Sequence, residues 1–121
     1  MSDPNHIRES DQRRLRELAA RHPKLFRGLV VPWFTPEGYL KMRAAASDRD
    51  NLFDTFEEFE QAAGERFHKA VADGHPAEKV VVDANALIAW CAEEGRPLDG
   101  MARQLFAAMT VVKRDAGAGH A

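Results

Sequence analysis

Apolar residues recur every three or four positions along most of the chain, and polar residues fill the positions between them. The longest such pattern covers residues 55–73 and places Phe56, Phe59 and Phe67 on one side. This spacing is typical of helices that bury one face. The sequence predicts five helices, over residues 10–22, 36–46, 55–73, 84–94 and 99–113.

Residues that begin and end helices bound these segments. Asp83 stands between a valine run and the fourth helix, and a carboxylate in that position usually accepts amide hydrogens of the first turn. Asp54 with Glu57 fits a capping box for the third helix, and Gly95 fits the end of the fourth. Gly64 lies in the middle of the third helix, where we expect another element to pack closely against it.

Two short segments have the composition of strands. Residues 28–34 (GLVVPWF) and 79–82 (KVVV) are rich in β-branched and aromatic residues. Pro32 has no amide hydrogen to donate, so the first segment is expected at the edge of a sheet or in an extended arm. The predicted fold class is α+β, predominantly helical, with about five helices and a minimal two-stranded sheet. Either helices cover such a sheet, or a second copy of the chain extends it.

The length of 121 residues corresponds to one domain. Residues 10–114 hold all the periodic patterns and are predicted to form a single globular domain, with Ser10 or Asp11 capping the first helix. Residues 1–9 and 115–121 are polar or small and lack such a pattern, so we expect two flexible tails.

Charge is unevenly distributed along the chain. The formal net charge is −2, but residues 1–50 carry 10 Lys and Arg against 7 Asp and Glu, a net charge of +3. The surplus, which includes Arg13 and Arg14, is either a solvated helix face or a patch that binds a partner. The single cysteine, Cys91, fits a reducing compartment, and no apolar stretch has the length of a membrane span or a secretory signal. We therefore expect a cytoplasmic protein that does not contact a membrane.

The sequence offers little support for catalysis. The five histidines are scattered, no glycine-rich phosphate loop is present, and Cys91 lies in an apolar helical pattern where a thiol serves as a small hydrophobe. Asp83 could act as a general acid or base only with a partner that the sequence does not supply. We predict no catalytic, cofactor-binding or metal-ligating residues, and we favour a protein that is not an enzyme.

The remaining candidate is a contact surface for another protein. Aromatic residues follow Pro32 closely, and exposed aromatics on an edge strand suit a protein partner, including a second copy of the chain. The alternative is that Trp33 and Phe34 pack under the long third helix. The predicted interaction surface comprises Arg13, Arg14, Val31, Trp33, Phe34 and Tyr39, and the predicted function is that of a non-catalytic protein–protein interaction or regulatory module.

A second hypothesis is nucleic-acid binding. Two short helices joined by a turn with Gly95 resemble a helix-turn-helix over residues 84–113. The second helix has few polar residues for the major groove, among them Arg103 and Gln104, and residues 84–114 carry a net charge of only +1. An ordinary helical hairpin that closes the core is the competing interpretation.

Several short motifs resemble a group of small bacterial proteins of unknown function. They are V-x-V-D-x-x-x-L-x-A-W-C-x-x-x-G-x-P-x-D-G-x-A-R from Val80 to Arg103, W-F-T-P-E-G-Y from Trp33 to Tyr39, and F-E-E-F from Phe56 to Phe59. The resemblance covers most of the chain between Trp33 and Phe106. It implies a bacterial, cytoplasmic protein, and it carries no activity and no catalytic residues.

Overall fold

A computed structural model describes residues 4–21 and 29–118, with side chains described for 9–21 and 30–114. These residues form five α-helices, one short 3-10 turn and two strands, which confirms the predicted α+β, mostly helical class. The elements in chain order are α1 Pro4–Arg21, β1 Leu29–Trp33, α2 Pro36–Ala45, η2 Arg49–Asn51, α3 Phe56–Ala72, β2 Ala77–Val81, α4 Ala84–Glu94 and α5 Gly100–Ala118.

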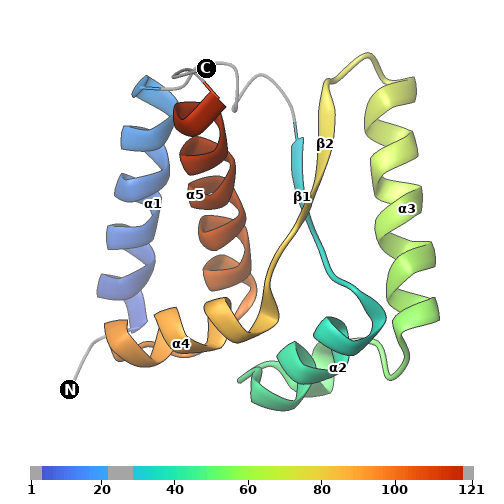
Figure 1. The fold of residues 1–121 in the computed structure, drawn as a ribbon, viewed down its shortest axis with the longest axis horizontal. Helices are drawn as coiled ribbons and strands as arrows, with labels where there is room; N and C mark the ends of the chain where they lie inside the picture. Colours follow the sequence, from blue (N-terminus) through green and yellow to red (C-terminus); the bar gives the residue numbers. More distant parts are fainter. Residues whose placement is uncertain (1–3, 22–28, 119–121) are drawn as a thin grey trace.

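The two strands pair in parallel, in a register that sets Leu29 beside Ala77 and Trp33 beside Val81. Parallel strands need a crossover connection, which α2 and α3 provide here. The strand pair lies between α1 and α5 on one side and α3 on the other, while α2 and α4 lie across the end where both strands finish (Figure 1).

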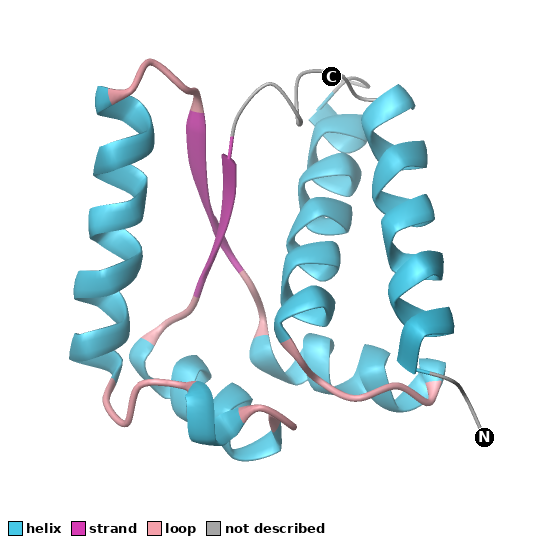
Figure 2. Ribbon diagram, turned by 180° about the vertical axis from the view of Figure 1, so that it is seen from behind, coloured by secondary structure: helices cyan, strands magenta, loops and turns pink. Residues whose placement is uncertain are grey.

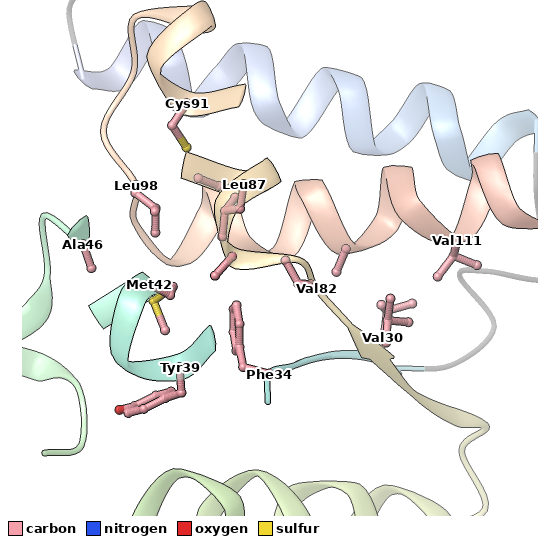
Figure 3. Close-up of a cluster of buried hydrophobic side chains, with 14 residues drawn as sticks. Val30, Phe34, Tyr39, Met42, Ala46, Val82, Leu87, Cys91, Leu98 and Val111 are labelled. Carbon is pink, nitrogen blue, oxygen red and sulfur yellow. The ribbon is translucent and has the colours of Figure 1, made fainter. Parts of the chain in front are cut away.

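The core fills the space between β1, α2, α4 and α5. Phe34, Tyr39, Met42 and Leu87 are among its largest fully buried side chains. Phe34, Tyr39 and Met42 come from neighbouring positions at the end of β1 and in α2, and Leu87 joins the cluster from α4, which is distant in the sequence (Figure 3). Full burial of a side chain of this size contributes about 1.5–3 kcal/mol, so these contacts fix α2 and α4 against each other at the end of the sheet.

Local chemistry begins and ends the helices largely as predicted. The Asp83 carboxylate accepts the Ala86 N–H at 3.2 Å, and Gly95 ends α4 with φ of +64°. The prediction for α3 is wrong by one residue: Thr55 caps the helix, and its hydroxyl both accepts the Glu58 N–H and donates to the Glu58 carboxylate. Thr55 has the extended backbone that a cap requires, and Asp54 pairs with an arginine of α2 instead.

Both terminal helices extend into the segments for which tails were predicted. Helix α1 begins at Pro4, where a proline at the first helical position has a favourable φ and needs no hydrogen-bond partner, and α5 extends to Ala118. Residues 1–3, 22–28 and 119–121 lie outside the described residues, together with the predicted end of the first helix. Asp11 is therefore inside α1 and does not cap it.

The expected close packing at Gly64 is also wrong. A Cβ atom at this position would have no other atom within 4 Å, so close packing of a neighbouring element does not require glycine here. It lies on a half-buried part of α3 where a larger residue would fit.

Candidate functional site

The aromatic residues that were expected to form an exposed surface are buried. Val31, Phe34 and Tyr39 are 3%, 1% and 1% exposed, and Trp33 is half-buried. The rings of Trp33 and Phe34 lie 5.5 and 6.0 Å from the ring of Phe59 on α3. The prediction that these aromatic residues are exposed is therefore wrong. The structure instead fits the alternative, in which Trp33 and Phe34 pack under the long helix, because β1 runs between α5 and α3 and both of its faces are covered.

The outer edge of β1 is closed to another strand. Backbone groups of successive strand residues point to alternate edges, and in this register those of Val30 and Pro32 point away from β2. The Gln104 side chain donates a hydrogen bond to the Val30 carbonyl at 3.0 Å, and Pro32 has no N–H to offer. Pro32 thus stands at an edge, as predicted, and it helps to protect that edge.

The outer edge of β2 is open. The Val82 N–H donates to the Trp33 carbonyl at 2.8 Å, so the backbone groups of Lys79 and Val81 point the other way. No hydrogen bond from another described residue reaches these outward groups. Val81 is 59% exposed, and no helix of the described ranges lies in front of the strands in either of two opposite views (Figures 1 and 2).

The Lys79 side chain is held away from this edge. Its ammonium group lies 4.4 Å from the ring centre of Trp33 and 4.9 Å from that of Phe67. Both are within the range of a favourable cation–π interaction. The lysine therefore covers the face toward α3 and leaves the backbone of β2 accessible.

The predicted basic residues of α1 lie elsewhere. Arg14 pairs with Glu94 of α4 at 2.5 Å, and its guanidinium lies 5.6 Å from the Trp90 ring, whereas Arg13 is exposed. Helix α1 packs on α5, on the opposite side of the strands from α3 (Figure 1). The structure thus does not bring Arg13 and Arg14 together with Trp33, and Arg14 serves to attach α1.

A buried ion pair also attaches α1 to the rest of the chain, and it was not predicted from the sequence. The Arg96 guanidinium donates two hydrogen bonds to the Asp11 carboxylate, at 2.5 and 2.6 Å, and the two side chains are 4% and 2% exposed. Burial by itself would lower the pKa of Arg96, but the hydrogen bonds and charge of Asp11 outweigh it and raise the pKa. Asp11 precedes Leu15 and Leu18 by four and seven residues, so helical periodicity could have placed it on the buried face.

The α4–α5 hairpin packs as part of the core. In α5, Ala102, Leu105 and Ala108 are at most 1% exposed, since α1 and β1 both pack against this helix. Arg103 donates two hydrogen bonds to the Asp48 carboxylate at 3.0 and 2.7 Å, and Gln104 bonds the backbone of β1. The two polar side chains that a recognition helix would present to a base pair are engaged within the chain.

The groups considered for catalysis have structural roles. The Asp83 carboxylate caps α4, as predicted. Cys91 is 4% exposed, and burial raises the pKa of its thiol, which keeps the sulfur protonated and weakly nucleophilic. Among the described residues, no three His, Cys, Asp or Glu side chains gather in a way that could hold a metal ion. No helix in the described ranges is long and apolar enough to cross a membrane.

Searches of protein-family models, curated proteins and solved structures find no match to this chain. The resemblance to small bacterial proteins therefore stays a prediction. Function has to be inferred from the geometry of the chain itself.

Proposed function

We propose that this protein is a non-catalytic protein–protein interaction module whose contact surface is the open edge of β2. The observation that carries the proposal is that the backbone groups of Lys79 and Val81 point outward on this edge, where Val81 is 59% exposed. Unpaired strand edges bind a further strand through main-chain hydrogen bonds, and folded proteins usually protect them. The contrast with β1, whose edge Pro32 and Gln104 close, singles out β2.

The partner that suits this edge best is a second copy of the chain. An antiparallel pairing centred on Val80 would set Lys79 of each copy opposite Val81 of the other, so that like charges do not face each other. Such an interface is self-complementary, as twofold dimers require. It would join two strand pairs into one four-stranded sheet and remove the open edge from both copies.

Sedimentation velocity on the full chain tests this proposal across the micromolar to millimolar range. We expect a monomer–dimer equilibrium in the unmodified protein, which Val81→Lys shifts toward monomer because an edge lysine opposes strand pairing. Val71→Lys is the matched control, since Val71 is 53% exposed on α3 and does not belong to β2. A monomer at every concentration, or equal effects of the two substitutions, would overturn the assignment.

The nucleic-acid hypothesis is not favoured by the same geometry. Arg103 and Gln104 make intramolecular contacts, and Arg114 pairs with Glu78 of β2 at 2.6 Å. Phosphate binding would have to compete with these interactions. A duplex-DNA gel shift that weakens steeply with salt would restore that hypothesis.

A further inference from the structure

A cavity of about 260 Å³ lies beside β1, between α2, α3 and the start of α5. Its floor is formed by Phe34, Tyr39 and Met42, each 1% exposed. Figure 3 shows Phe34 and Tyr39 on the side of the core that faces α3. The lining residues Phe53 and Arg66 are exposed, so they mark the mouth of the cavity. The cavity is thus apolar in its depth and open to solvent at a positively charged side chain.

Aromatic rings form the walls of this cavity and hold its shape. The Tyr39 and Phe59 rings stack with centres 4.7 Å apart, and Phe34 meets Phe59 edge-on. The Tyr39 hydroxyl donates a hydrogen bond to the Phe53 carbonyl at 2.5 Å. Burial raises the pKa of Tyr39, so this hydroxyl stays protonated and fixes the segment that carries Phe53 beside the mouth. The walls are therefore preformed, as ligand sites usually are.

The charge around the cavity is unbalanced. Arg66 and Arg103 both line it, and no Asp or Glu is among the described lining residues. Arg103 is neutralised by its two hydrogen bonds to Asp48. Arg66 makes no hydrogen bond or ion pair with any described residue. The mouth thus offers one uncompensated guanidinium, whose planar donors match a carboxylate.

We propose that this cavity binds a small organic carboxylate with an apolar body. The body would lie against the wall formed by Tyr39, Phe34 and Phe59, and the carboxylate would bind Arg66. An apolar cavity of about 150 Å³ is sufficient to bind benzene, so the space here accommodates an aromatic ring or a short branched chain. The site is separate from the β2 edge, because no residue of β2 lines it. An experiment that supports or excludes ligand binding in this cavity therefore does not test the proposed interaction surface on β2.

Amide chemical shifts of the full chain, followed by NMR during titration, provide the test. Benzoate should produce saturable shifts at Phe59 and Ala63, and Arg66→Ala should weaken its binding about 10- to 100-fold through loss of the charged hydrogen bonds. Benzyl alcohol, which lacks the charge, should bind more weakly than benzoate and be insensitive to Arg66→Ala. Lys69→Ala, which removes another exposed cation of α3, is the matched control and should change neither probe.

A second variant tests the cavity rather than the charge. Ala62 is a half-buried lining residue, so Ala62→Leu should fill the space and abolish the shifts from both probes. Absence of saturable shifts with benzoate would overturn the site. Equal binding of benzoate and benzyl alcohol, or equal effects of Arg66→Ala and Lys69→Ala, would overturn the assignment of a carboxylate ligand.

Discussion

The buried ion pair between α1 and the α4–α5 turn gives a prediction whose size follows from burial. Asp11→Ala removes the carboxylate and leaves the Arg96 charge enclosed, with its side chain 4% exposed and two hydrogen bonds lost. The pKa of Arg96 is raised in the folded protein, so the guanidinium starts as a cation. Removing one partner of a buried pair costs about 3–5 kcal/mol. That is a large part of the roughly 5–15 kcal/mol that stabilises a typical domain.

Urea unfolding followed by circular dichroism measures this cost. With a slope of about 2 kcal/mol per M, Asp11→Ala should lower the midpoint by about 2 M. Glu94→Ala is the matched control, because the Arg14–Glu94 pair joins α1 to the last residue of α4, next to the same turn, with both side chains 36% exposed. An exposed pair contributes only about 0.2–1 kcal/mol. The double substitution Asp11→Leu with Arg96→Met removes both charges and should recover much of the loss. A loss below about 1 kcal/mol for Asp11→Ala, or no recovery in the double variant, would refute the reasoning.

Three further predictions concern local structure. Gly64→Ala should raise the free energy of unfolding by about 0.5–1 kcal/mol through helix propensity, whereas Gly95→Ala should lower it by about 1–2 kcal/mol because φ is positive there. A Cβ atom would meet no other atom within 4 Å at either site, so steric clashes do not contribute. Urea titrations in which both substitutions change the free energy of unfolding in the same direction would contradict this reasoning. Asp83→Ala should cost about 1 kcal/mol by uncapping α4, and an unchanged melting temperature would argue against the cap. The hydrogen bonds from Arg103 hold the pKa of Asp48 below its ordinary value of about 4, so its contribution to stability is complete above that pH and is lost as the pH falls through the folded value. Asp48→Asn should flatten the dependence of unfolding free energy on pH in this acidic range, and identical slopes in both proteins would contradict the linkage.

Features set by neighbouring residues could be predicted from the sequence. Asp83 and Gly95 bound α4 because a cap depends on the side chain and backbone of a few adjacent positions. The cap of α3 shows the limit of such local predictions. Asp54 and Thr55 are both good capping residues, and only the backbone conformation of the folded chain decides between them. The helical class followed from the same local periodicity.

Features set by distant residues could not be predicted. Asp11 meets Arg96 across 85 positions, and nothing in either segment alone requires the pairing. The burial of Phe34 and Tyr39 depends on α3 packing over β1, which an apolar run by itself does not specify. Likewise, which strand keeps an open edge depends on the parallel register and on Gln104 of a remote helix.

The most direct test of the proposed interaction surface is amide hydrogen exchange in β2 at two protein concentrations. At low concentration, the Lys79 and Val81 amides should exchange rapidly because they point outward, while the Val82 amide is protected by its bond to Trp33. At high concentration, the amides of Lys79 and Val81 should become protected and that of Val82 should stay so. Rapid exchange of Lys79 and Val81 at both concentrations would contradict pairing through this edge.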